Sequence, residues 1–304
     1  MSTVSALGRA ELGRRLREGS IDLRTGAFVT RIHSPFASVA DGLHLLYADY
    51  PLLDNNEFAD FHVDIAPPPS LRRWYKPLAR FVYDGMAPFL PLPAAQAFPM
   101  FEWGMNWCVS SRAHEYLILH AAVVEKNGRA AILPAPPGSG KSTLCAALVS
   151  RGWRLLSDEL ALVRPQDGLL APLPRPISLK NASIAVMRRY QPDAVISNPV
   201  PDTTKGTVAH LKAPSDSIAR AHELARPGWI VFPKYTAGAA TTLLDLTPAR
   251  AFMRVAENGF NYSVLGARGF SALGELVAQS RCIDFTYSAL DEAIAVFEQL
   301  AGAA

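Results

Sequence analysis

The segment Pro-Ala-Pro-Pro-Gly-Ser-Gly-Lys-Ser-Thr at residues 134–143 dictates the local path of the chain more tightly than any other part of the sequence. Apolar residues 130–133 run directly into it, and residues 144–150 after it are predicted to form a helix. Gly138 and Gly140 allow the backbone to fold tightly, so that successive N–H groups can point inward at an anion. A strand, a glycine-rich loop and a helix in this order predict a phosphate-binding loop in an α/β core.

The loop fits the nucleotide-binding pattern with Ala135 in place of its first glycine. Lys141 is predicted to reach the β- and γ-phosphates of ATP, and the Ser142 hydroxyl to join the Mg²⁺ shell. The positive N-terminal end of the following helix favours the same anion. The predicted nucleotide-binding residues are therefore Gly138, Ser139, Gly140, Lys141, Ser142 and Thr143. The alternative is a connecting loop without a ligand, but the strand before it and the helix after it favour the phosphate site.

Three further residues are candidates for chemistry. Asp158 and Glu159 follow a predicted strand at residues 153–156, where carboxylates can hold Mg²⁺ or accept a proton from a hydroxyl. The alternative is a solvated turn, because acidic pairs at strand ends are common. His120 is placed at the end of an apolar strand over residues 116–124, where a lone histidine is usually a core or edge residue.

The rest of the chain divides into a smaller α+β domain at residues 1–110 and the loop-bearing domain at residues 111–304. In the first, strands are predicted at 27–32 and 61–65. Its aromatic residues are expected to pack a core rather than grip a ligand: Trp74, Tyr75, Phe81, Tyr83, Phe101, Trp103 and Trp107. In the second, Asn-Gly at 127–128 predicts a tight hairpin. Helix is predicted at 214–225 and strand at 229–232, 241–246 and 282–287. Thr247-Pro248 and Ser288 with Asp291 are expected to begin helices.

Composition narrows the class of protein. A formal net charge of +3 spread along 304 residues gives no argument for nucleic acid as a partner. No apolar run reaches the roughly 18 residues that a membrane helix needs, and no secretory signal is evident, so we expect a cytoplasmic protein. Three widely spaced cysteines (Cys108, Cys145 and Cys282) predict reduced, buried thiols.

These motifs, taken in order, resemble the HPr kinase/phosphorylase family. The resemblance rests on Leu-His-Ala-Ala-Val-Val at 119–124, the loop at 138–143, and Arg-Gly-Trp-Arg-Leu-Leu-Ser-Asp-Glu at 151–159. It covers residues 116–160, about a seventh of the chain. In that family a histidine, a hairpin, a phosphate loop, a short helix and a strand ending in two acids follow one another. The resemblance implies a P-loop kinase core similar to that of HPr kinase and phosphoenolpyruvate carboxykinase. The chain looks most like a divergent branch of HPr-related kinases.

The resemblance also implies roles for residues. Asp158 would be the general base, and Glu159 would bind the metal or support a residue that does; these two roles could be exchanged. His120 would orient the acceptor or an acidic neighbour. The next active-site segment would fall at 175–181, where Ser178 stands in place of an acid, and Lys180 and Asn181 replace an Arg-Gly pair. The Arg-Gly-rich signature of the reverse phosphorylase reaction is therefore not evident. The family forms rings, so a homo-oligomer is compatible with the resemblance.

We therefore expect a kinase that uses ATP and Mg²⁺ to phosphorylate a serine-like hydroxyl on a small HPr-like carrier protein. One alternative is a small-molecule hydroxyl kinase; another is a nucleotide-binding regulatory module without transfer. A DNA-acting ATPase is disfavoured because no basic stripe is evident. Lys205 lies in a polar stretch where a mobile loop could bring it to the γ-phosphate, or where it could be an ordinary surface residue.

Overall fold

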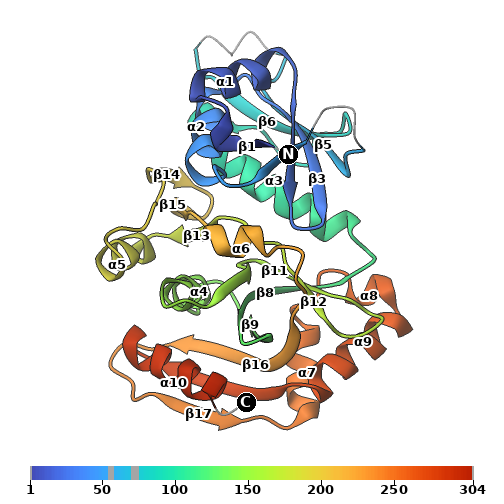
Figure 1. The fold of residues 1–304 in the computed structure, drawn as a ribbon, viewed down its shortest axis with the longest axis vertical. Helices are drawn as coiled ribbons and strands as arrows, with labels where there is room; N and C mark the ends of the chain where they lie inside the picture. The colour runs from blue at the N-terminus through green and yellow to red at the C-terminus, as the bar shows by residue number, and fades with distance from the viewer. Residues whose placement is uncertain (1, 54–57, 70–74, 303–304) are drawn as a thin grey trace.

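The computed structural model describes residues 2–53, 58–69 and 75–302, and it is a mixed α/β structure built on three sheets (Figure 1). Ten α-helices occur in the described residues: α1 (Arg9–Glu18), α2 (Ala37–Leu46), α3 (Ala97–Arg112), α4 (Lys141–Ser150), α5 (Ala182–Tyr190), α6 (Ser215–Ala219), α7 (Pro248–Ala256), α8 (Tyr262–Leu265), α9 (Ala267–Ala278) and α10 (Leu290–Gly302). The described residues also contain the short 3₁₀ helices η1 (Val4–Ala6) and η3 (Ala94–Gln96).

The N-terminal sheet has seven strands in the order β1-β4-β2-β3-β5-β6-β7. Its strands are β1 (Ser2–Thr3), β2 (Ile21–Thr25), β3 (Phe28–His33), β4 (Pro51–Leu53), β5 (Phe61–Ala66), β6 (Leu78–Tyr83) and β7 (Leu92–Pro93). The strands predicted at 27–32 and 61–65 are confirmed as β3 and β5. Of the aromatic residues expected in the core, Phe81, Tyr83 and Phe101 are buried, Trp103 and Trp107 are half-buried, and Tyr75 is exposed. Trp74 lies outside the described residues.

The central sheet has eight strands in the order β12-β11-β8-β9-β16-β18-β17, with β10 also paired to β8. Its strands are β8 (Leu117–Lys126), β9 (Arg129–Pro134), β10 (Arg154–Ser157), β11 (Leu160–Val163), β12 (Leu170–Ala171), β16 (Arg226–Tyr235), β17 (Thr242–Asp245) and β18 (Arg281–Tyr287). β9, β16 and β18 are parallel neighbours. Their carboxyl ends therefore meet at one edge of the sheet, which is where ligands commonly bind in such sheets.

A third, smaller sheet lies beside this edge. It consists of β13 (Ile177–Lys180), β15 (Gly206–Leu211) and β14 (Val200–Thr203), paired antiparallel in that order. Figure 1 shows it between α5 and the N-terminal sheet. Its position brings the C-terminal end of β13 close to the helix α4, and so to the glycine-rich loop.

Burial of both faces explains why β8 and β9 read as almost continuous apolar runs. Along β8, Ile118, Ala122 and Val124 join one core cluster, whereas Leu119 and Val123 join another. The first cluster contains residues of α4 and α10, and the second contains residues of α7 and α9. A strand covered on both faces needs apolar residues at every position, as in parallel sheets generally.

The predicted hairpin is confirmed. Asn127 and Gly128 connect β8 to β9 with φ angles of 56° and 79°, the positive values that a tight two-residue turn requires. The helix after the loop is likewise confirmed as α4, and the chain leaves it through Gly152, whose φ is 89°. The cysteines are free and buried: Cys108 on α3, Cys145 on α4 and Cys282 on β18.

The N-terminal sheet and the central sheet share one core. A single cluster of buried side chains runs from Val4 through α3 to α10. A buried ion pair between Glu102 of α3 and Arg175 reinforces this junction, and Tyr47 donates a hydrogen bond of 2.7 Å to Glu102. The predicted boundary at residue 110 falls in the last turn of α3, and the division into two domains stays a prediction.

Three local predictions are wrong. Helix α6 ends at Ala219 instead of continuing to 225, because Ala225 exchanges two backbone hydrogen bonds with Leu170. Ser288 does not cap α10: its hydroxyl donates to the carbonyl of Ala239. His120 lies inside β8, opposite Leu160 of β11, and not at a strand end. The helix predicted to begin after Thr247 does begin at Pro248.

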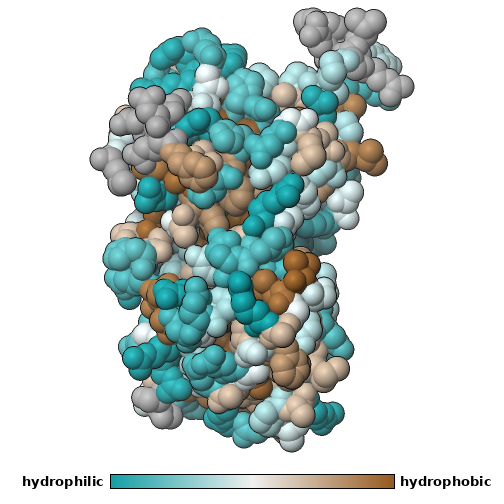
Figure 2. Space-filling model, turned by 90° about the vertical axis from the view of Figure 1, so that its right-hand side faces the viewer, coloured by the Kyte–Doolittle hydropathy of each residue, from teal (hydrophilic) through white to brown (hydrophobic). Residues whose placement is uncertain are grey.

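Figure 2 shows one face of the molecule, on which hydrophobic residues occur in small separate groups among hydrophilic ones. Such scattered groups are normal for a protein surface. Among the described residues, no helix combines the length and the apolar character that crossing a bilayer would require.

Candidate functional site

The glycine-rich loop joins the end of β9 to the start of α4, and two of its glycines have backbone angles that other residues rarely adopt. Gly138 has φ 86° and Gly140 has φ 90°. At Gly140 space is also lacking, since a Cβ there would lie 2.6 Å from the Tyr287 hydroxyl. Ala135, which replaces the first glycine of the pattern, is buried and is not among the residues with positive φ. Its side chain therefore imposes no backbone strain.

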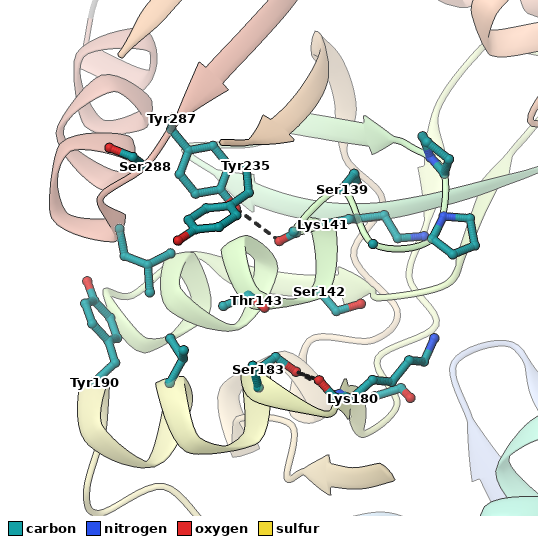
Figure 3. A pocket seen from close by; sticks show the side chains of 18 of the residues that line it. Ser139, Lys141, Ser142, Thr143, Lys180, Ser183, Tyr190, Tyr235, Tyr287 and Ser288 are labelled. Atoms are coloured by element: carbon teal, nitrogen blue, oxygen red, sulfur yellow. Dashed lines mark hydrogen bonds between the residues drawn. The ribbon is translucent and has the colours of Figure 1, made fainter. Parts of the chain in front are cut away.

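The loop opens onto a cleft of about 720 Å³. Its walls come from the loop, β8, β13, α5, the last residues of β16 and β18, and the start of α10. Figure 3 shows this cleft with α4 between the ends of two strands and α5. The residues that line it include His120, Gly138, Ser139, Gly140, Lys141, Ser142, Thr143, Glu159, Ser178, Lys180, Val186, Tyr190, Tyr235, Tyr287, Leu290 and Asp291. The structure thus brings His120, the loop and Glu159 together at one cleft.

Asp158 is buried next to this cleft, with only 4% of its surface exposed. Its Oδ2 accepts a hydrogen bond of 3.0 Å from the backbone N–H of Ser178, and within the described part of the chain its Oδ1 has no hydrogen-bond partner. Burial raises the pKa of Asp158 to about 6, the Glu159 charge adds to the rise, and Lys141 opposes it. A carboxyl group with a pKa near neutrality can accept a proton at physiological pH.

Glu159 is the centre of a charged cluster. Its carboxylate lies 3.1 Å from His120 Nε2 and 3.8 Å from Lys180 Nζ. Burial acts to raise the pKa of Glu159, but the hydrogen bond from His120 and the charge of Lys141 outweigh burial and lower it. Glu159 is therefore the acid of the pair that stays ionised, and Asp158 is the one that can exchange a proton.

Lys141, the first residue of α4, is buried with 7% of its surface exposed. Its Nζ is among the buried side-chain atoms that find no hydrogen-bond partner in the residues the structure describes. Burial lowers the pKa of Lys141, while the charges of Glu159 and Asp158 raise it. A buried ammonium group without a direct partner is costly, because its desolvation is not compensated. An anion at the mouth of the loop would compensate it.

These observations test whether the residues fit a magnesium nucleotide. In the part of the chain that the structure describes, four buried polar atoms near the loop have no hydrogen-bond partner: Ser139 Oγ, Lys141 Nζ, Asp158 Oδ1 and Ser178 Oγ. The described residues contain no group of three or more His, Cys, Asp or Glu side chains that could hold a metal alone. Mg²⁺ in nucleotide sites is bound through one or two protein groups together with phosphate oxygens. Lys141 with the loop could hold the phosphates, and Ser142 with one of the two acids could hold the ion.

Lys205 lies where sequence reasoning did not expect it. It belongs to a two-residue turn between β14 and β15, and not to a long mobile loop. The Thr203 hydroxyl tightens this turn by donating to the Gly206 carbonyl and accepting from the Lys205 N–H. The Lys205 ammonium lies 5.0 Å from the centre of the Trp103 ring. It is not among the residues that line the cleft.

Sequence reasoning missed the aromatic part of the site. Tyr235 and Tyr287 are the last residues of β16 and β18 and lie directly opposite each other in the parallel pair. The Tyr287 hydroxyl donates to the Gly140 carbonyl at 3.2 Å, and the Tyr235 N–H donates to the Ser139 carbonyl at 2.9 Å. Each tyrosine lies at or just after the end of a predicted strand, but nothing local pairs the two. Their meeting at the loop depends on strand pairing.

The fold and the cleft together define a mixed α/β protein with a glycine-rich loop at the carboxyl edge of parallel strands. The family model described as ScmC, SynChlorMet cassette protein ScmC, matches residues 98–192, about a third of the chain. The matched part includes α3, the loop, α4, the two acids and α5. A comparison with curated proteins found no match.

Proposed function

We propose that this protein is a P-loop kinase that transfers the γ-phosphate of ATP, with Mg²⁺, to a serine-like hydroxyl. The observation that carries the proposal is the pairing, at one glycine-rich loop, of a buried lysine and a buried carboxylate; within the described residues Lys141 Nζ and Asp158 Oδ1 have no hydrogen-bond partner. In the proposal Lys141 holds the polyphosphate and Asp158 accepts the proton. The proposal includes a core like that of HPr kinase and phosphoenolpyruvate carboxykinase, with residues 111–304 as the kinase domain.

In this proposal each side chain has one task. Asp158 accepts the proton of the acceptor hydroxyl, whose oxygen bonds to the γ-phosphorus as the bond to the β-phosphate oxygen breaks. Lys141 and the loop N–H groups stabilise the negative charge that develops on the phosphate oxygens. When bound, Mg²⁺ neutralises further phosphate charge. Glu159, held ionised by His120, is the second carboxylate available to the ion.

The proposal allows two kinds of acceptor: a small carrier protein related to HPr, or a free metabolite with a hydroxyl group. The two are separated by whether transfer requires a protein partner. Lys205 is proposed to act on the γ-phosphate as a charge from outside the cleft. Burial lowers the pKa of Lys205, and the charges of Glu159, Lys180 and Lys141 also act on it. An unchanged transfer rate in Lys205→Ala would show that Lys205 is an ordinary surface residue.

The rival function is a regulatory module that binds the nucleotide without transfer. The raised pKa of Asp158 favours the kinase, because mere binding of a magnesium nucleotide needs ionised carboxylates. A binding module would tolerate Asp158→Asn without loss of function.

The test is incubation of the purified protein with γ-labelled ATP, Mg²⁺ and either a cell lysate or a metabolite extract. We expect label on a protein or on a metabolite, with a rate that increases as the pH rises through about 6, because only ionised Asp158 accepts the proton. Asp158→Asn should bind ATP normally but transfer phosphate about two to four orders of magnitude more slowly. Lys141→Ala should lose nucleotide turnover.

Two outcomes would decide against the proposal. Normal turnover in Lys141→Ala would remove the loop from the chemistry. Binding of ATP by the wild-type protein without any release of label to an acceptor or to water would favour the regulatory module.

A further inference from the structure

The cleft has two chemically different ends, with the loop between them. Figure 3 shows Lys141, Ser142 and Lys180 extending toward one side, while Tyr190 and Tyr235 lie toward the other. The first end also holds His120 and Glu159, so it is charged. The second end is lined by Val186 and Tyr190 of α5, Leu290 of α10, and Tyr235 with Tyr287, together with the polar side chains of Arg189, Ser288 and Asp291. We call this second end the aromatic arm.

Tyr235 presents an unusually exposed ring at this position. Half of its surface (50%) is accessible, although it ends a buried parallel strand and lies against the loop. Its ring is held edge-to-face by Tyr287, with ring centres 5.8 Å apart and an angle of 69°. Tyr287 itself is 1% exposed and hydrogen-bonded to the loop. The Tyr235 ring is therefore oriented by its neighbours and still open to the cleft.

Buried polar atoms without a hydrogen-bond partner lie at the charged end, whereas the polar side chains of the aromatic arm (Arg189, Ser288 and Asp291) are exposed or half-buried. Around the cleft, the buried side-chain atoms without partners are those of Ser139, Lys141, Asp158 and Ser178; within the described residues none belongs to the aromatic arm. At the far end of the arm, Asp291 already accepts a hydrogen bond of 3.0 Å from Tyr190 and lies 3.8 Å from Arg151.

We propose that the aromatic arm binds the base of the nucleoside triphosphate by stacking on Tyr235, and that it recognises the flat face of the base without reading its edge. The inference rests on the proposed function, because it assumes polyphosphate at the loop. A ligand with a polyanionic end and a flat aromatic end matches the two ends of the cleft. Sites that discriminate strongly between similar ligands do so through buried polar groups, whereas stacking accepts any base because every base has a flat aromatic face. The donor nucleotide is therefore weakly selected.

The experiment measures binding by titration calorimetry with two ligands, Mg-ATP and Mg-tripolyphosphate, which lacks a base. Tyr235→Ala is expected to raise the Kd for ATP by about 5- to 100-fold, the range for loss of one base stack, and to leave the Kd for tripolyphosphate unchanged. Alanine retains the Cβ that packs near Gly140, so the loop keeps its support. Tyr235→Phe should bind ATP like the wild type. GTP and CTP should bind within about tenfold of ATP.

A matched control is Tyr75→Ala, which removes a tyrosine that is 85% exposed on the N-terminal region and should change neither Kd. An unchanged ATP Kd in Tyr235→Ala would overturn the stacking role. So would an equal loss for ATP and tripolyphosphate, because that result would mean damage to the loop. A Kd for GTP more than about a hundredfold above that for ATP would show that the site does recognise the edge of the base. Failure of the wild-type protein to bind either ligand would instead overturn the proposed function.

Discussion

Asp158 illustrates at the residue scale how a chemically useful group is unfavourable for folding. It is buried beside a second carboxylate, and one of its two oxygens has no partner among the described residues. Burial raises the pKa of Asp158 to about 6, above its ordinary value of 3.8. The folded state therefore holds this proton more tightly than the unfolded chain does. The resulting stabilisation is complete below about pH 4 and is lost as the pH rises through 6.

We predict that Asp158→Asn makes the protein more stable at pH 7.5, by up to about 3 kcal/mol, because a two-unit pKa shift corresponds to that amount. Asparagine keeps an oxygen that can accept from the Ser178 N–H but never ionises. The gain should shrink as the pH falls through 6 and disappear only below about pH 4, where Asp158 is protonated in both the folded and the unfolded chain. Urea unfolding of both proteins at several pH values measures this difference. A variant that is less stable than the wild type at pH 7.5 would mean that the carboxylate is not strained by its surroundings.

At the scale of elements, the turn between β13 and α5 carries an unusual backbone. Asn181 has φ 51° and ψ −122°, a combination that is normally confined to glycine. Its side chain compensates in part, because Oδ1 accepts a hydrogen bond of 3.1 Å from the Thr207 N–H. The turn aims Lys180 and the start of α5 at the cleft, so the strain is located where the cleft is shaped.

We predict that Asn181→Gly is more stable than Asn181→Ala by about 1–2 kcal/mol, because only alanine keeps the backbone strain. Both variants lose the bond to Thr207, so this loss cancels between them. The usual order is the reverse, with glycine about 0.5–1 kcal/mol worse than alanine. Ala185→Gly, at an exposed position in α5, serves as the control and should follow the usual order. Denaturant unfolding compares the four proteins. Equal stability of the two Asn181 variants would show that the turn relaxes without cost.

For the whole molecule, the decisive contact is the junction beneath α3. Arg175 is buried, pairs with Glu102, and donates a hydrogen bond of 2.7 Å to Asn106. The segment just before β13 is thereby tied to the helix that packs against the N-terminal sheet. Because one core cluster also crosses this junction, we expect the two halves to unfold together.

We predict that Arg175→Met lowers the free energy of unfolding by about 3–5 kcal/mol, because it leaves the Glu102 carboxylate buried without its cation. Combining it with Glu102→Leu should recover most of that loss, since no buried charge then remains. Circular dichroism and tryptophan fluorescence should report one common transition in all three proteins. A single variant within 1 kcal/mol of the wild type would show that water reaches the junction.

The sequence predicts best those features that depend on residues close together in the chain. The hairpin, the loop and α4 depend on Asn127, Gly128 and the glycines of one contiguous stretch, so they were predicted correctly. The meeting of Tyr235 with Tyr287 joins positions 52 residues apart through strand register, which no local pattern encodes. The position of Lys205 in a tight turn likewise depends on how β15 pairs with its neighbours, and α6 is shortened by a pairing with distant Leu170.

The three buried cysteines can report where and how often the structure opens locally. Each thiol lies on a different layer: Cys108 under the N-terminal sheet, Cys145 behind the glycine-rich loop, and Cys282 on the parallel strand that ends in Tyr287. A thiol reagent can modify each of them only during moments when its layer opens. The order in which the three masses appear would therefore rank the layers by how often they open. A nucleotide that closes the cleft should slow the labelling of Cys145 before that of the other two.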